Sequence, residues 1–138
     1  MNDSLFYAIL SMDAYNRSVS LGTSVSLELP SSAADGLGSA TLAGASDVPS
    51  DSFFAQAYNW QGKVVISYRG TDHLLSDLAT GWGVGAGIYN SPQAHDAAQF
   101  FQLLNGNRIA PNPNIVLTGH SLGGGLAGFV GECQRHER

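Results

Sequence analysis

The stretch that decides the fold is Asn114-Ile115-Val116-Leu117-Thr118-Gly119-His120-Ser121-Leu122-Gly123-Gly124-Gly125. Residues 115–118 are apolar or β-branched, which predicts a short buried strand. The small and apolar residues after Ser121 predict a helix. A serine in Gly-x-Ser-x-Gly between a strand and a helix is typical of a nucleophile elbow, a sharp turn that exposes the hydroxyl above a sheet. An ordinary glycine-rich turn is the alternative, because this short motif also occurs by chance.

The glycines of the motif have a steric role in such a turn. The turn brings the backbones on either side of the serine close together, so Gly119 and Gly123 leave room that a β-carbon would fill. The following helix points its N-terminus at the serine, and this positive end of the helix dipole favours negative charge there. Ser121 is therefore the candidate nucleophile.

Composition predicts one globular domain, residues 1–138. Hydrophobic residues make up 43% and charged residues 12% of the chain, and there are 17 glycines, which favours a tightly packed α/β domain. The net charge is −5 with only six Lys plus Arg, so we expect no nucleic-acid partner. The single cysteine, Cys133, excludes an internal disulfide. Residues 1–4 lack the basic start of a Sec signal peptide, which leaves the cytoplasm and leaderless secretion both open.

The residues before the motif predict an N-terminal helix from Asp3 or Ser4 to about Tyr15. Two β-rich runs follow, Phe53–Tyr58 and Val64–Tyr68, joined through residues 59–63 with Gly62 in the turn. Val64-Val65-Ile66 is apolar on both faces, which favours a central strand covered by helices. The other expected features are an edge strand at 25–29, a loop at 31–47 with at most a short strand at 40–43, and a mobile loop at 80–88.

A second helix is expected between the hairpin and the motif. Ser91-Pro92 is a helix-start signature, and Asn105-Gly106 is a stop signal. Between them, the apolar residues at helical spacing are Ala94, Ala97, Phe101 and Leu104. The chain then returns through residues 107–114 to the strand of the motif.

A break in the pattern, Arg69-Gly70-Thr71-Asp72, follows the second run of the hairpin. Open α/β sheets bind ligands at the carboxyl ends of their strands, where this break falls. An oxyanion hole needs two backbone N–H groups, one from the residue after the nucleophile and one from the loop after an earlier strand. Leu122 and Thr71 fit these two positions, and the Thr71 hydroxyl can add a third donor.

The base and the acid of a catalytic triad are not evident. Elbow hydrolases place them after the serine, with the carboxylate before the histidine. The 17 residues after Ser121 contain one histidine, His136, on the order of 20 Å along the expected helix. We interpret His120 as packing or hydrogen bonding beneath the turn, and His73 and His95 as structural or solvated.

The paired motifs, Tyr68-Arg69-Gly70-Thr71 and Gly119-His120-Ser121-Leu122-Gly123-Gly124, resemble those of the fungal-type (class 3) lipase family of α/β-hydrolases. The resemblance covers most of residues 1–133, and the order of the expected elements also fits. It implies that Ser121 is the nucleophile and that Thr71 and Leu122 form the oxyanion hole. It also implies that Asp77 orients Thr71, for which a surface acid near a helix start is the alternative reading.

The sequence departs from the pattern of that family in two places. No triad Asp and His follow the elbow helix, and the segment after Thr71 is short for a long lid helix. We therefore expect an α/β-hydrolase-type, mostly parallel sheet flanked by helices and truncated after the elbow helix, with an atypical charged tail at 132–138.

The expected function is a serine ester hydrolase, a lipase or carboxylesterase that acts through an acyl-enzyme on a lipid or small ester, without metal or cofactor. Alone, this chain is expected to be inactive. Two alternatives stay open: an inactive fragment or pseudoenzyme that binds acyl ligands, and one half of a two-chain hydrolase. In the latter, a complementary C-terminal chain supplies the acid and the base. The exposed sheet edge beside residues 115–118 favours such a partner, or self-association.

Overall fold

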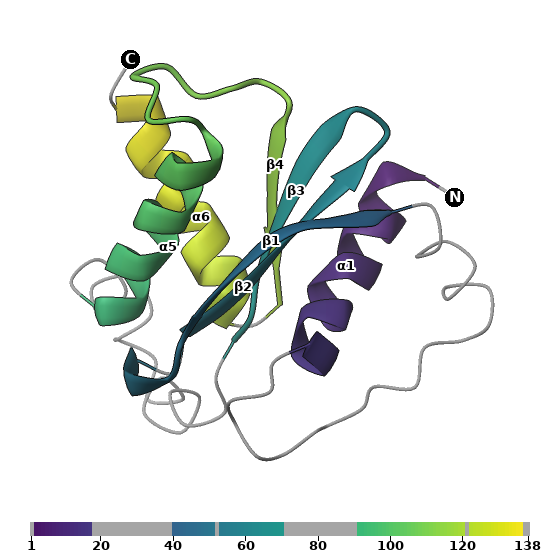
Figure 1. Cartoon of the computed structure of the whole chain (residues 1–138), viewed down its shortest axis with the longest axis horizontal. Coiled ribbons are helices and arrows are strands. Elements are labelled where there is room, and N and C mark those ends of the chain that lie inside the picture. Colours follow the sequence, from purple (N-terminus) through teal and green to yellow (C-terminus); the bar gives the residue numbers. More distant parts are fainter. Residues whose placement is uncertain (1, 18–39, 52, 71–90, 121, 137–138) are drawn as a thin grey trace.

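A computed structural model describes residues 2–17, 40–51, 53–70, 91–120 and 122–136. A central sheet has α1 on one face and α5 and α6 on the other, so the domain is of the α/β class (Figure 1). None of the helices in these ranges is long and apolar enough to cross a membrane. The elements in chain order are α1 (Asp3–Arg17), β1 (Thr41–Val48), the 3-10 helix η1 (Pro49–Asp51), β2 (Phe53–Trp60), β3 (Lys63–Tyr68), α5 (Pro92–Leu104), β4 (Ile115–Gly119) and α6 (Leu122–His136).

The sheet is mixed, with the strand order β1-β2-β3-β4. The pairs β1–β2 and β2–β3 are antiparallel, and only β3–β4 is parallel. The expectation of a mostly parallel sheet was therefore wrong for the described strands. Short connections join β1 to β2 and β2 to β3, which forces antiparallel pairing, whereas the chain from β3 to β4 passes through α5 and can return parallel.

The hairpin between β2 and β3 is tighter than the sequence suggested. Gln61 and Gly62 alone form the loop, with φ angles of 48° and 74°. Positive φ at both central residues is typical of the two-residue turns that match the twist of a hairpin. The positive φ predicted for Gly62 is confirmed, and the strands extend to Trp60 and from Lys63.

Strand β1 is the main element that the sequence underestimated. Residues 31–47 were expected to be loop with at most a short strand at 40–43, yet Thr41–Val48 pairs with β2 along its whole length. Its residues are exposed or half-buried, so no apolar alternation marks it in the sequence. The backbone ladder to β2 holds it, with a register shift between Leu42 and Gly44. The expected strand at 25–29 and loop at 80–88 lie outside the described residues.

The helix boundaries were largely predicted. The Ser91 side chain accepts a hydrogen bond from the Ala94 N–H at 3.1 Å, and Pro92 opens α5, as expected from the sequence. At α1 the cap differs by one residue from the prediction. The Asn2 side chain, and not Asp3 or Ser4, accepts the Leu5 N–H at 2.8 Å. Helix α1 also continues to Arg17, two residues beyond the expected end.

Two hydrophobic clusters lie on opposite faces of the sheet. On the α1 face, the Phe6 and Trp60 rings stack with centroids 4.1 Å apart, and Val65 packs with them. On the other face, Ile66 packs with residues of α5 and α6. Adjacent residues of β3 thus point to opposite clusters, which confirms the prediction of a central strand covered on both faces.

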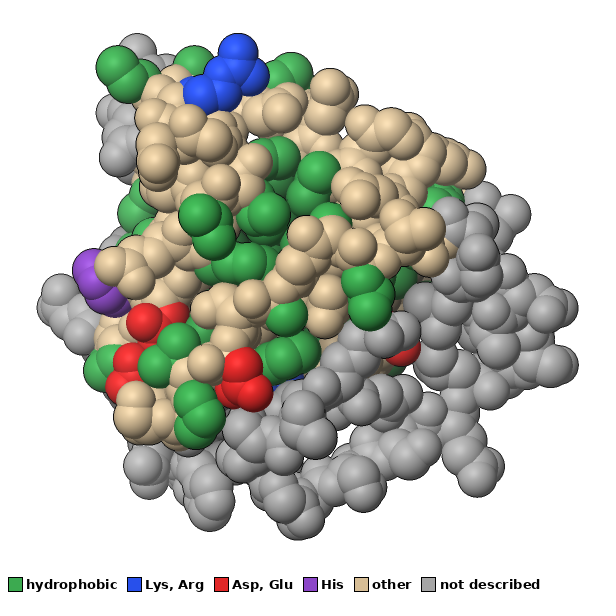
Figure 2. All heavy atoms as spheres, viewed as in Figure 1, with side chains coloured by type: hydrophobic (Ala, Val, Ile, Leu, Met, Phe, Trp, Pro, Cys, Tyr) green, Lys and Arg blue, Asp and Glu red, His purple; other side chains and the backbone are tan. Residues whose placement is uncertain are grey.

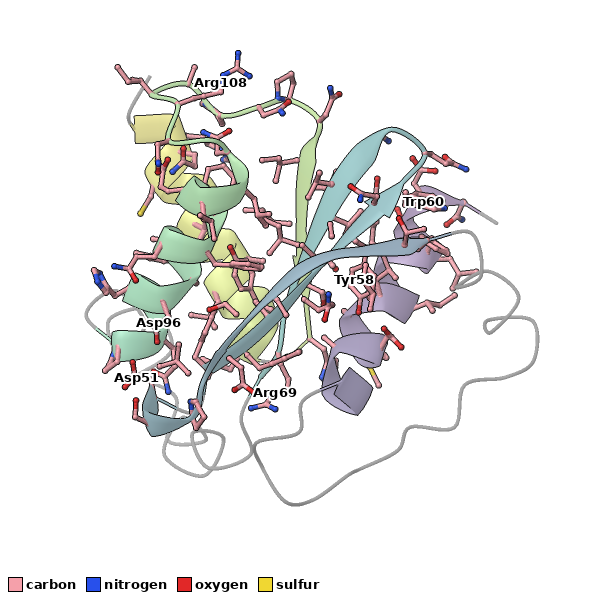
Figure 3. The ribbon with its side chains drawn as sticks, viewed as in Figure 1. Asp51, Tyr58, Trp60, Arg69, Asp96 and Arg108 are labelled. Atoms are coloured by element: carbon pink, nitrogen blue, oxygen red, sulfur yellow. The ribbon has the colours of Figure 1, made fainter. Side chains whose placement is uncertain are left out.

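The α1 face also holds a buried polar pair. The Tyr58 hydroxyl donates a hydrogen bond of 2.7 Å to Asp13, and both side chains are buried. Figure 3 shows Tyr58 and Trp60 between the sheet and α1. This bond fixes α1 against the sheet, because a buried carboxylate needs a donor.

Candidate active site

The ends of β3 and β4 form the candidate site. Tyr68 pairs with Gly119 as the last register pair of the two parallel strands. The carboxyl ends of both strands therefore lie at one edge of the sheet, where α6 also begins (Figure 1). The two motifs, whose first residues Tyr68 and Gly119 are 51 positions apart in the sequence, are adjacent in space.

The backbones on the two sides of the turn from β4 into α6 lie close together. The His120 carbonyl accepts a hydrogen bond from the Gly123 N–H at 3.0 Å, so the chain reverses within a few residues. A β-carbon on Gly119 would overlap the carbonyl group of Gly123 and approach the Gly124 nitrogen to 2.8 Å. Only glycine fits at position 119, because the nearest atoms belong to the backbone and cannot rotate away.

The start of α6 packs directly on the end of β3. A β-carbon on Gly123 would overlap the Tyr68 carbonyl oxygen and lie 3.1 Å from the Arg69 carbonyl carbon. Backbone therefore touches backbone at this point. Leu122 is the first residue of the helix, and its side chain is buried in the cluster beneath. Its N–H is one of the groups that an α-helix leaves without an intrahelical partner.

The chain is firmly held where it leaves β3. The Arg69 N–H donates to the Phe54 carbonyl at 3.0 Å, and the Arg69 guanidinium lies over the Phe54 ring, 5.6 Å from its centroid. Arg69 is only 3% exposed, and Gly70 is buried as well. Figure 3 shows Arg69 at the same end of the sheet as the start of α6. Thr71 follows this anchored segment in the chain.

A buried phenol supports the same strand end from below. The Tyr68 hydroxyl donates a 3.0 Å hydrogen bond to the Ala97 carbonyl of α5. Burial raises the pKa of Tyr68 above its usual value, so the phenol keeps its proton and acts only as a structural donor.

Several predicted site residues, Ser121, Thr71 and Asp77 among them, lie outside the described residues, as does His73. Of the described ones, the structure brings Gly119, His120, Leu122 and Gly123 together with the end of β3.

The described histidines are His95, His120 and His136. His120 is exposed, and its expected role of packing or hydrogen bonding beneath the turn stays a prediction. His95 is exposed on α5, consistent with the solvated role expected for it. His136 is the last residue of α6, roughly 20 Å along the helix from Leu122.

An acidic pair that the sequence analysis missed lies at this end of the molecule. Asp51 of η1 and Asp96 of α5 lie close together in Figure 3, and acidic side chains gather there on the face shown in Figure 2. Burial, together with a hydrogen bond to Asp51, raises the pKa of Asp96 to about 6. Asp96 therefore keeps its proton to a higher pH than a solvated aspartate does. No local motif marks residues 45 positions apart, so only the fold could reveal the pair.

In the described ranges, no group of three or more His, Cys, Asp or Glu side chains is placed to hold a metal ion.

Comparison with protein families agrees with this geometry. The family model of the Tle-like phospholipase domain, described as phospholipase-like, matches residues 6–133. Because the match spans nearly the whole chain, the protein belongs to this family. The family is of the lipase type, which indicates a hydrolase of lipid esters, although it does not single out the fungal-type class 3 lipases. No curated protein and no solved structure matches the chain.

Proposed function

We propose that this protein is a serine hydrolase of phospholipids or related lipid esters, with Ser121 as the nucleophile. The observation that carries the proposal is the packing of Gly123 on the Tyr68 carbonyl, which sets the N-terminus of α6 directly on the end of β3. In a nucleophile elbow, such backbone contact brings the helix N-terminus and the strand-end loop to one reacting centre.

The reaction that fits this arrangement is acyl transfer. The Ser121 oxygen attacks the ester carbonyl, and its proton passes to a base. The C–O bond to the alcohol then breaks, the alcohol leaves with that proton, and water releases the fatty acid from the acyl-enzyme. The N–H groups of Leu122 and Thr71 stabilise the oxyanion, helped by the Thr71 hydroxyl and by the dipole of α6. Asp77 orients Thr71, and His120 borders the nucleophile on its exposed side.

The base and the carboxylate come, in this proposal, from residues outside 1–138. Strand β4 favours that arrangement. It is the last strand of the described sheet, and all five of its residues are only half-buried although three of them are Ile, Val and Leu. A strand added along β4 would complete the sheet as an α/β-hydrolase like the class 3 lipases, and could carry the missing groups. It would belong either to a continuation of this chain or to a second chain, which makes a two-part hydrolase the second candidate.

We expect a fluorophosphonate probe to form one covalent adduct, on Ser121. The sample to label is the complete protein that hydrolyses esters, with the base and the carboxylate present. The probe phosphonylates a serine only when the hydroxyl is activated and the new oxyanion is stabilised. Peptide mapping by mass spectrometry locates the adduct. Ser4→Ala is the control, because Ser4 is an exposed serine at the start of α1. An adduct elsewhere, or labelling that persists in Ser121→Ala, would end the assignment of the nucleophile.

Thr71→Val tests the oxyanion hole in the same preparation. The hydroxyl is expected to matter mainly as the negative charge forms, so turnover falls more than the KM rises. Loss of one such donor typically costs roughly 3 kcal/mol, or about a hundredfold in kcat. Thr71→Ser, which keeps the hydroxyl, should retain most of the turnover. Full turnover in a folded Thr71→Val protein would exclude the side chain from the hole.

A further inference from the structure

Two carboxyl groups from distant parts of the chain meet where the β1–β2 corner, residues 49–51, approaches α5. Asp51 is the last residue of η1, and Asp96 lies in the second turn of α5. Figure 3 shows the two side chains close together, and both residues are half-buried. The contact therefore joins the β1–β2 corner to the helix through two acidic groups.

The Asp96 carboxyl has a buried oxygen that needs a donor. Its Oδ2 atom is buried, and no N–H or O–H group of the described residues donates to it. Native proteins rarely leave a buried acceptor unmet. The side chain that hydrogen-bonds with Asp96 is itself a carboxyl, that of Asp51. Two ionised carboxylates are acceptors only, so a hydrogen bond between them requires a proton on one of the two.

The charges around Asp96 favour this proton on balance. Burial, then the hydrogen bond to Asp51 and its like charge, raise the pKa of Asp96 to about 6, whereas His95 beside it on α5 lowers that pKa. Asp47, the acid of β1, is exposed, and no Lys or Arg of the described ranges shifts the pKa of Asp96. When both carboxyls ionise, their repulsion acts directly on the contact between η1 and α5.

The β1–β2 corner lies next to the end of β3. A single residue separates η1 from β2, and the carbonyl of Phe54 in β2 accepts the Arg69 N–H at 3.0 Å. We propose that Asp51 and Asp96 form a proton-operated latch. One shared proton holds the β1–β2 corner against α5 in mildly acidic solution, and loss of that proton toward neutral pH loosens the corner. The latch does not rest on the assignment of the nucleophile and would survive its failure.

The first test follows the carboxyl ¹³C resonance of Asp96 by NMR as the pH is changed, with EDTA present so that no divalent cation bridges the two carboxylates. In the unaltered protein the midpoint is expected at about 6. Asp51→Asn removes the like charge and offers an amide donor to the ionised Asp96, so the midpoint should fall by about one pH unit or more.

His95→Gln is the control for this titration. It changes the charge beside Asp96 on α5 and leaves the Asp51 carboxyl in place, so it should not lower the midpoint. A midpoint that stays near 6 in Asp51→Asn would show that burial alone raises the pKa of Asp96, and would overturn the proposal. A midpoint near the usual value of about 4 in the unaltered protein would overturn it as well.

The second test measures the latch itself. A carboxyl whose pKa is raised on folding binds its proton more tightly in the folded protein, so its contribution to stability is present below about pH 4. That contribution is lost as the pH rises through about 6. The amide of Asp96→Asn needs no added proton to donate. The urea midpoint of the unaltered protein should therefore fall, relative to that of Asp96→Asn, between about pH 4 and pH 7.

Hydrogen exchange of the segment 49–54, corrected for the intrinsic effect of pH on the exchange rate, reports the corner directly. The segment should lose protection over the same pH window in the unaltered protein and keep it in Asp96→Asn. If Asp96→Asn does not fold, Asp51→Asn provides the same comparison from the other side of the pair. An equal pH dependence of the urea midpoint in both proteins, or unchanged protection of segment 49–54, would overturn the latch.

Discussion

Gly123→Ala is expected to destabilise the protein by about 3 kcal/mol or more, at the upper end of the range for overpacked sites. The added β-carbon would overlap the Tyr68 carbonyl oxygen, and the backbone has no rotamer that relieves the clash. The start of α6 would have to move off β3, which would loosen the contacts of Leu122 in the core beneath it. Urea denaturation followed by circular dichroism measures the loss, which is a large part of a typical domain's 5–15 kcal/mol.

Gly128→Ala is the matched control on the same helix. No atom lies within 4 Å of the position that its β-carbon would occupy. Alanine is the better helix former, so this change should stabilise the protein by roughly 0.5–1 kcal/mol. The same substitution five residues apart is thus expected to have opposite signs. A Gly123→Ala protein as stable as the unaltered one would show that α6 does not rest on β3.

The second large effect concerns activity. Residues 1–138 alone are expected to hydrolyse a short-chain nitrophenyl ester at no more than a trace rate, because the sequence does not offer a triad carboxylate and histidine in the usual order after Ser121. His95 and His120 are exposed, and His136 lies at the far end of α6. A protein that keeps its oxyanion hole but lacks its triad can still accelerate the hydrolysis about 10³-fold over the reaction in water.

Addition of a C-terminal polypeptide that carries the acid and the base should raise this rate by about 10³-fold or more, since triad members act as a unit. The measurement uses chain of verified mass, with Ser121→Ala as the control. Robust turnover by residues 1–138 alone that vanishes in Ser121→Ala would contradict the prediction. His136, or a histidine of a second copy, would then be the next residue to mutate.

Sequence patterns were most informative where a local requirement fixes the residue type. Ser91-Pro92 marked the start of α5 because a cap and a first-turn proline act within four residues. Gly119 and Gly123 marked the tight turn because nothing larger fits. Strand β1 escaped prediction because a half-exposed strand of small residues depends on its backbone ladder to β2 and carries no apolar pattern.

The sequence by itself therefore determined most of the described elements and the motif: the central strand β3, the turn into α6 and the candidate nucleophile within it. Each follows from interactions among residues close together in the chain. Only the tertiary structure decided that one pair of strands is parallel, that Gly123 rests on Tyr68, that Asp51 lies beside Asp96 and that Gln134 lines a groove with α5. These contacts join residues between 31 and 55 positions apart, and no local propensity encodes them. The packing of helices on both faces of the sheet brings them together.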